Sequence, residues 1–284
     1  MGDILSGLES MGLGNFNNID LFHDKPKETA KKQESGKPKE VKLEEKDLIF
    51  IKNIECICCG REFKEKIVRP GKVKLVAQDV DLRPRYNELD TLKYNVTACP
   101  FCGYAALSKE FKKLSDGQVK LIKENISTNF SGLKYENDVY SYDEAIARNK
   151  LALINSVIKK GRLSERAYIC LSLGWLTRGK AESIAKDDAQ AEQFVEQYRK
   201  EELEYLKKAA EGFDEALQKE SFPICGLDEH TFYYLLAALH YETGSYNESL
   251  RYVEKIVLNR NIAERIKDKA RRIKEAIAEI NKNK

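Results

Sequence analysis

The sequence predicts an α+β protein that is mostly α, in which a small cysteine-bearing β module is followed by an antiparallel array of helices. Three observations lead to this prediction. Two Cys-x-x-Cys pairs lie among short segments of alternating apolar residues, the apolar period becomes helical beyond the second pair, and glycines separate the helical stretches. The chain of 284 residues exceeds the usual domain size of about 100 to 150 residues, so we expect two folded parts.

The composition indicates an intracellular protein that does not cross a membrane. Charged residues make up 33% of the chain and hydrophobic residues 42%, which favours helices with large solvated faces. No apolar run approaches the roughly 20 residues that a bilayer span requires, and the N-terminus lacks the basic start and apolar stretch of a secretory signal. We therefore expect a cytoplasmic location and no membrane partner.

The first 47 residues are expected to precede the folded core. Residues 1–22 contain no Lys or Arg and place apolar side chains on one face of a short helix, namely Ile4, Leu5, Leu8, Met11 and Leu13. Docking onto the chain itself, or disorder, is favoured over docking in a partner's groove, because short helices are marginal in water. Residues 23–47 are mostly charged or polar, which predicts a disordered linker.

Residues 48–115 are expected to form the β module. Two short strands are predicted from the alternating residues Val73, Leu75, Ala77, Tyr94, Val96 and Ala98. Pro70 and Gly71 supply a turn signal. The module holds 13 basic and eight acidic residues, an excess of positive charge that attracts phosphate or an acidic protein surface.

The strongest signal in the sequence is the two cysteine pairs. Cys56 and Cys59 form the first pair, and Cys99 and Cys102 form the second. Four thiolates around a tetrahedral ion make a closed structural zinc site, with no open position for a substrate water. A glycine follows each pair and permits the positive φ of a tight knuckle. Residues 60–98 leave room for the hairpins of a zinc-ribbon-like module.

Other roles for the cysteines fit the sequence less well than zinc binding. A redox pair of the thioredoxin kind needs a βαβ context that the sequence lacks. A rubredoxin-like iron site uses the same knuckles, but a large helical part without a further cofactor signature favours zinc. Cys58 lies inside the first pair and is expected to be a free thiol near the metal. Cys170 and Cys225 lie in helical surroundings and are expected to be plain core residues.

The segments around the cysteines resemble an uncharacterised bacterial family, domain of unknown function 2225 (DUF2225). They are CICCG at residues 56–60, DLRPRY at 81–86, YNVTACPFCGYAA at 94–106, and Phe111. The resemblance covers about residues 48–220. It implies a bacterial, cytoplasmic protein with metal knuckles and helical repeats, and it carries no established activity. Cys58 and the charged linker have no counterpart in the family pattern.

The rest of the chain, residues 116–284, is expected to be a helical repeat domain. Apolar periodicity predicts helices at 105–114, 118–130, 142–159, 165–178, 187–220, 228–243, 246–259 and 262–281. Gly161, Gly179, Gly226 and Gly244 are expected to separate helices. Ser164 and Asp228 are expected to be N-caps.

Two helical segments share a pattern in which a small residue follows a leucine and a glycine ends the segment. They are LSLGWLTRG at 171–179 and LAALHYETG at 236–244. The second continues to Tyr246 and Ser249, and it resembles a tetratricopeptide repeat, moderately over residues 231–261. Ser249 replaces the usual Ala, and the terminal Pro is missing.

The repeat resemblance extends loosely over residues 142–220. It implies antiparallel helix pairs in which Ala237 and Ser249 occupy the close approach between two helices. Such arrays present a concave groove, so we expect a protein or peptide partner to bind there.

Two polar clusters allow further interpretations. The first, Asp79, Asp81, Arg83, Arg85 and Tyr86, is either an anion-binding loop or a set of ion pairs bracing a loop near the metal, and bracing is favoured. The second is the basic series Arg61, Lys64, Lys66, Arg69, Lys72 and Lys74. Acidic residues interrupt that series, so nucleic-acid binding is the less favoured interpretation.

No catalytic centre is visible. The three histidines are scattered, and the phosphate-loop, metalloprotease and serine-hydrolase motifs are absent from the sequence. The sequence therefore predicts a non-enzymatic, zinc-stabilised scaffold that binds a protein or peptide through its helices. The alternatives are a nucleic-acid-binding regulator and, third, a rubredoxin-like iron redox protein.

Overall fold

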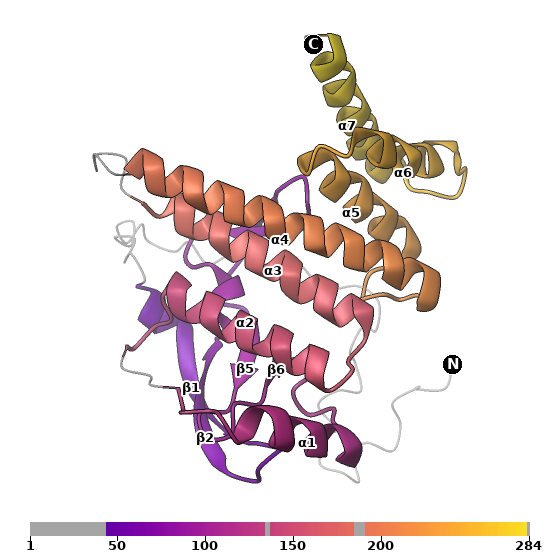
Figure 1. Ribbon diagram of the computed structural model, residues 1–284. Helices are drawn as coiled ribbons and strands as arrows, with labels where there is room; N and C mark the ends of the chain where they lie inside the picture. The colour runs from indigo at the N-terminus through magenta and orange to yellow at the C-terminus, as the bar shows by residue number, and fades with distance from the viewer. Residues whose placement is uncertain (1–43, 134–136, 185–190, 283–284) are drawn as a thin grey trace, which may run out of the picture. The chain divides into compact units, whose positions relative to one another are not determined.

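The computed structural model describes residues 44–133, 137–184 and 191–282 (Figure 1). These residues belong to one compact unit, Leu43–Lys284. The segment 1–22 and most of the linker 23–47 lie outside the described residues, so those predictions are not tested. Within the described ranges, none of the helices combines the length and the apolar character needed to cross a bilayer.

Three antiparallel hairpins form the β part of the protein. β1 (Ile49–Glu55) pairs with β2 (Glu62–Val68), β3 (Leu75–Gln78) with β4 (Pro84–Tyr86), and β5 (Val96–Ala98) with β6 (Ala105–Leu107). Two 3-10 helices, η3 (Glu45–Leu48) and η4 (Thr91–Tyr94), precede β1 and β5. The turns of the first and third hairpins carry the two cysteine pairs, so pairing of the strands positions the thiols.

The helical part matches the periodicity over most of its length (Figure 1). Its helices are α1 (Asp116–Ile122), which continues as the π-helical turn η5 (Lys123–Ser127), α2 (Tyr142–Ile158), α3 (Leu163–Glu182), α4 (Ala191–Lys219), α5 (Glu229–Glu242), α6 (Tyr246–Leu258) and α7 (Glu264–Lys282). Each helix packs on the next from α2 to α7. The prediction of a mostly helical protein with a small β part is confirmed.

The helix predicted at 105–114 is wrong, because its first residues form β6. The second knuckle turns the chain back on itself, and Ala105 pairs with Ala98 of β5. Both Ala105 and Ala106 are completely buried. The linker also ends earlier than residue 47, because Glu45 belongs to η3 and accepts a hydrogen bond of 2.6 Å from the hydroxyl of Tyr94.

Two predicted helix boundaries are corrected in α3. Gly179 lies inside this helix, where an added Cβ would stand 2.6 Å from the Tyr142 ring, so the glycine permits a close approach and does not end the helix. Ser164 is the second residue of α3 and donates its hydroxyl to Glu220 at 2.6 Å, so it is not the cap. Asp228 is confirmed as the N-cap of α5, since its carboxylate accepts the amides of two residues of the first turn.

The close approach of α5 and α6 is confirmed. Ala237 and Ser249 are both completely buried. The Ser249 hydroxyl donates a hydrogen bond of 2.7 Å to the carbonyl oxygen of Ala237. The serine therefore gains a backbone partner on the neighbouring helix, which explains how it occupies a position where alanine is usual.

A buried ion pair joins the β part to the helices. Helix α2 lies across β5 and β6 (Figure 1), and its Arg148 reaches Glu65 of β2 at 2.6 and 2.7 Å. The two side chains are 2% and 3% exposed. Arg148 also donates to the carbonyl oxygen of Val96, and the hydroxyl of Tyr140 donates to Glu65. One guanidinium thus ties β2, β5 and α2 together.

We predict that Arg148→Met lowers the free energy of unfolding by about 3 to 5 kcal/mol, because it leaves the Glu65 carboxylate buried without its partner. Urea unfolding of the full chain measures the change. The double variant Glu65→Gln/Arg148→Met is expected to recover part of the loss. Lys200→Met removes an exposed pair with Glu196 and serves as the control, with a change below about 0.5 kcal/mol. Equal losses in Arg148→Met and Lys200→Met contradict the assignment.

Candidate metal centre

Each cysteine pair lies in a knuckle with the same backbone pattern. In the first, the amide of Gly60 donates to the carbonyl of Cys56 at 2.7 Å, and in the second the amide of Gly103 donates to the carbonyl of Cys99 at 3.2 Å. The amides of Cys56 and Cys99 each donate to the carbonyl five residues later, at 3.0 and 2.8 Å. The two glycines have φ of 73° and 72°, a conformation that costs other residues about 1–2 kcal/mol.

The two knuckles bring four sulfur atoms together. The Sγ atoms of Cys56 and Cys102 are 3.6 Å apart, and those of Cys59 and Cys99 are 3.8 Å apart. All four lie within 4.8 Å of one another. A tetrahedral ion with zinc–sulfur bonds of about 2.3 Å requires sulfur separations of about 3.8 Å, so the donor set fits such an ion. The sulfur atoms predicted as ligands are therefore close enough to share one metal.

The sulfur atoms lie in an apolar cluster. Cys56 and Cys99 are completely buried, and the rings of Phe63, Tyr104 and Phe111 pack beside the knuckles. The rings of Tyr104 and Phe111 are stacked, with their centroids 4.8 Å apart, and the Tyr104 hydroxyl donates a hydrogen bond to the carbonyl oxygen of Phe111. This packing keeps Cys56, Cys99 and Cys102 away from water while Cys59 is half-buried, and low exposure strengthens the attraction between a thiolate and a cation.

The crowded thiols cannot all lose their protons without a cation. Hydrogen bonds from Cys102 and Cys56 lower the pKa of Cys99. The hydrogen bonds that Cys102 shares with Cys56, Cys58 and Cys99 raise the pKa of Cys102. Loss of a proton from one thiol therefore makes the loss of a proton from an adjacent sulfur atom less favourable. A divalent cation removes this restriction by binding four thiolates at once.

The remaining cysteines lie in different surroundings. Cys58 is buried beside the four sulfur atoms, and its hydrogen bond with Cys102 lowers its pKa. Cys170 lies in the core around α3, where burial raises its pKa to about 11, as expected of a core thiol. Cys225 is exposed and has a φ of 52°, so its prediction as a core residue is wrong. The turn before α5, not a helix, holds it.

The Asp–Arg cluster braces the loop of the β3–β4 hairpin, which agrees with the favoured interpretation. Its partners, however, lie on helices α3, α4 and α5 and not beside the cysteines. Asp81 is completely buried and accepts hydrogen bonds from Trp175 and Arg178 of α3, both at 2.8 Å. Arg178 also pairs with Glu202 of α4 and Glu242 of α5. Burial and the nearby Asp81 raise the pKa of Glu242, whereas Arg178 opposes that rise. Sequence reasoning missed the four helical members, Trp175, Arg178, Glu202 and Glu242, because no local signal links them to the loop.

The basic series of the β module does not form a continuous stripe. Lys64 of β2 is exposed, whereas Lys66 is half-buried and lies 4.4 Å over the ring of Tyr140. Lys66 also donates a hydrogen bond to the carbonyl oxygen of Asn137. Part of the positive charge is therefore occupied by contacts within the protein, which weakens the case for a phosphate-binding strand.

Comparison with known proteins gives one result. A family model described as an uncharacterized protein conserved in bacteria (DUF2225) matches residues 49–277. No curated protein and no solved structure matches the chain. The matched region contains both cysteine pairs and α2 to α6 in full.

We predict that Gly103→Ala destabilises the protein more than Gly60→Ala. Both changes strain a positive φ, at a cost of about 1–2 kcal/mol. At Gly103 the added Cβ would also stand 2.7 Å from the ring of Phe130, whereas at Gly60 it meets nothing within 4 Å. Overpacking adds about 1–3 kcal/mol to the Gly103 change. Thermal unfolding of the two variants checks the order, and a larger loss in Gly60→Ala contradicts it.

Proposed function

We propose, since the chain belongs to the bacterial DUF2225 family, that its four clustered cysteines bind one structural zinc ion and that the protein acts as a non-enzymatic scaffold for a protein partner. The single observation that carries the metal proposal is the set of four sulfur atoms, all within 4.8 Å of one another. Cys56 and Cys59 would hold the ion from one hairpin, and Cys99 and Cys102 from another.

A metal bound by these residues would cross-link the β1–β2 and β5–β6 hairpins. Each hairpin has only two strands, and an isolated two-stranded hairpin is marginally stable in water. Four protein ligands complete a tetrahedral ion, so such a site supplies folding energy and not an activated water. The role that fits this donor set is therefore structural.

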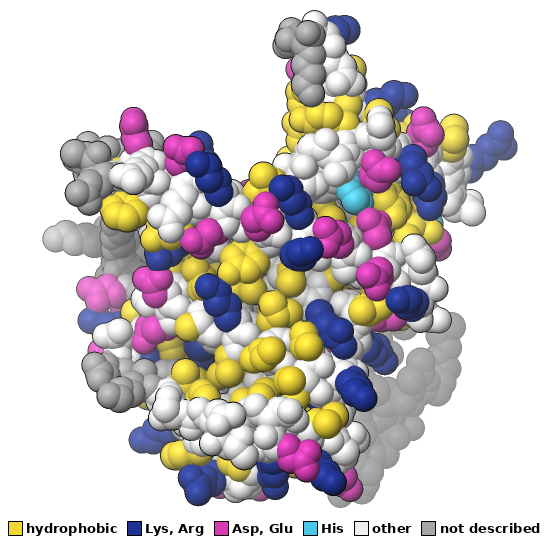
Figure 2. Space-filling view, viewed as in Figure 1, with side chains coloured by type: hydrophobic (Ala, Val, Ile, Leu, Met, Phe, Trp, Pro, Cys, Tyr) yellow, Lys and Arg dark blue, Asp and Glu magenta, His cyan; other side chains and the backbone are white. Residues whose placement is uncertain are grey.

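An exposed apolar face on α2 supports the scaffold proposal. Ile154 and Val157 of this helix are 47% and 44% exposed, and Figure 2 shows apolar side chains gathered over α2 and α3. The β3–β4 loop already occupies part of the surface between α3 and α5, through Asp81. We therefore assign the partner to the outer face of α2, in place of the concave groove.

The metal proposal is tested by Cys99→Ser in the full chain. The wild type is expected to contain one zinc ion per chain, measured by elemental analysis, and to be colourless. Loss of one thiolate is expected to abolish stoichiometric zinc and to loosen the two hairpins, because the ion contributes folding energy. Visible charge-transfer bands with bound iron contradict zinc, and a fully folded, metal-free wild type contradicts any metal.

Two further cysteine variants test the ligand assignment. Cys225→Ser changes a thiol outside the four-sulfur cluster, one that donates to the carbonyl oxygen of Ser164, and is the matched control, expected to keep its zinc. Cys58→Ser is also expected to keep its zinc, because four ligands remain. Zinc lost in Cys58→Ser and retained in Cys59→Ser contradicts the assignment of the first pair.

The partner proposal is tested by cross-linking the purified full chain in a bacterial lysate. A discrete protein is expected with the wild type and with the control Glu196→Lys, which changes an exposed residue of α4. The double variant Ile154→Lys/Val157→Lys is expected to lose that protein while its thermal unfolding is unchanged. Equal recovery with all three contradicts the α2 surface. Recovery of nucleic acid that declines steeply with salt favours the nucleic-acid alternative.

A further inference from the structure

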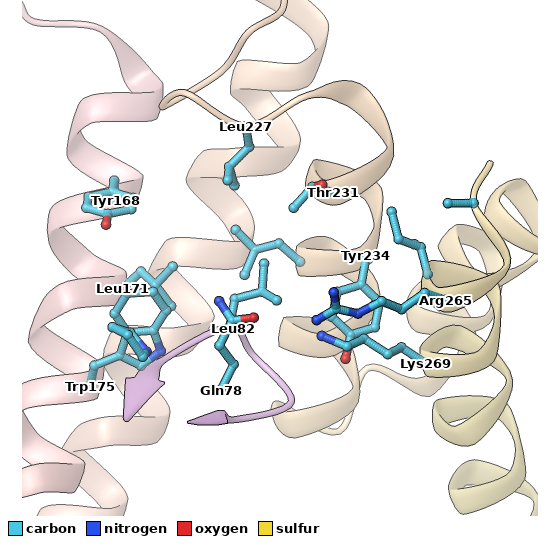
Figure 3. A pocket seen from close by; sticks show the side chains of 14 residues that line it. Gln78, Leu82, Tyr168, Leu171, Trp175, Leu227, Thr231, Tyr234, Arg265 and Lys269 are labelled. Carbon is cyan, nitrogen blue, oxygen red and sulfur yellow. The ribbon is translucent and has the colours of Figure 1, made fainter. Parts of the chain in front are cut away.

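A pocket of about 480 Å³ lies between the β3–β4 hairpin and helices α3, α5 and α7 (Figure 3). Tyr168, Leu171 and Trp175 line it from α3, and Leu82 lies at its centre. Leu235 of α5 adds to a mainly apolar wall. Pockets of about 300–1,000 Å³ with apolar walls and a few polar groups are typical of small-molecule sites.

The hairpin holds this wall in place. Leu82 has a φ of 67°, a left-handed conformation that is unfavourable for leucine. Its neighbours fix it there, because Asp81 is bound by Trp175 and Arg178 while Arg83 pairs with Asp90 at 3.0 Å. The loop is thus anchored on both sides of the strained residue. The side of the pocket that Leu82 lines is therefore held in a defined position.

Two cations of α7, Arg265 and Lys269, line the opposite side of the pocket (Figure 3). Within the described part of the chain, neither makes an ion pair with a carboxylate. Their neighbours on the same helix do, since Lys267 and Arg271 both pair with Glu264. Lys269 is half-buried and Arg265 is exposed. Burial and the charge of Arg265 lower the pKa of Lys269, so an anion beside both side chains would be attracted.

Tyrosine side chains add polar groups to the same lining. Tyr234 is only 5% exposed, and Lys269 lies 5.5 Å over its ring. Within the described residues, the hydroxyls of Tyr168 and Tyr234 have no hydrogen-bond partner. Tyr168 is half-buried, and neither hydroxyl is among the buried atoms that lack a partner, so both are open to a bound polar group. The pocket therefore combines an apolar wall with unpaired positive charge and free hydrogen-bonding groups.

We propose that this pocket binds a small anionic amphiphile, a molecule with an apolar body and one carboxylate or phosphate head. The head lies at Arg265 and Lys269, where it replaces the missing counter-ion. The apolar body lies against Leu171, Trp175 and Leu235. The site is independent of the cysteines, so this inference and the zinc proposal stand or fall separately.

The fluorescence of Trp175 provides the test. It is the sole tryptophan of the chain, is 4% exposed and lines the pocket, so its emission reports on occupancy. Dodecanoate and dodecyl phosphate, each below its micelle concentration, are titrated into the full chain, and dodecanol and dodecyltrimethylammonium serve as neutral and cationic probes. A saturable change is expected for the anionic probes. The tighter of these two identifies the preferred head group.

Two variants test the positive charge and the apolar space of the pocket separately. Lys269→Met is expected to weaken binding of the anionic probes by about tenfold or more, because a charge-assisted contact is lost. Lys274→Met, an exposed position on the same helix, is the matched control and is expected to leave binding unchanged. Ile266→Phe narrows the pocket and is expected to weaken the binding of every probe that binds the wild type. Equal binding of cationic and anionic probes, no saturable change, or equal effects of Lys269→Met and Lys274→Met overturns the proposal.

Discussion

A carboxylate buried as deeply as that of Glu65 is stable only beside a group of opposite charge, and in this chain that group comes from Arg148, far along the sequence. Neither residue is satisfied unless β2 and α2 are docked. The cost of desolvating both ions is offset only in the assembled structure. The cysteine hairpins and the helices therefore belong to one compact unit, although the sequence suggests a boundary near residue 115, and that boundary stays a prediction.

The candidate metal centre depends on the same docking. Asn155 of α2 is completely buried and donates a hydrogen bond of 2.9 Å to the carbonyl of Gly103, at the end of the second knuckle. Ser127 donates to the carbonyl of Cys102. The thiols are thus held by strand pairing within each hairpin and by helical side chains outside it. A metal at this position would add to the hydrogen bonds by which Asn155 and Ser127 hold the second knuckle.

The loop of the β3–β4 hairpin covers part of the inner surface of the helical array. A repeat array buries its core between successive helices and leaves its inner surface available. Here Asp81 and its neighbours extend from the β part to α3, α4 and α5, so one loop fills part of that surface and leaves a pocket beside it. The two proposed binding sites therefore lie on different parts of the helical array. The protein partner is proposed at the outer face of α2, and the small anionic amphiphile is proposed in the pocket lined by α7.

The sequence by itself determined the features that depend on neighbouring residues. Apolar periodicity gave α2, α5 and α6 within two residues, and the spacing of Cys56, Cys59, Cys99 and Cys102 indicated which sulfur atoms lie together. Only the tertiary structure decided the features that depend on distant partners. Strand β5 made a strand of Ala105–Leu107, where the local pattern favours a helix. The buried ion pair of Arg148 and the partly buried ion pairs of Arg178 likewise depend on contacts that no local pattern encodes.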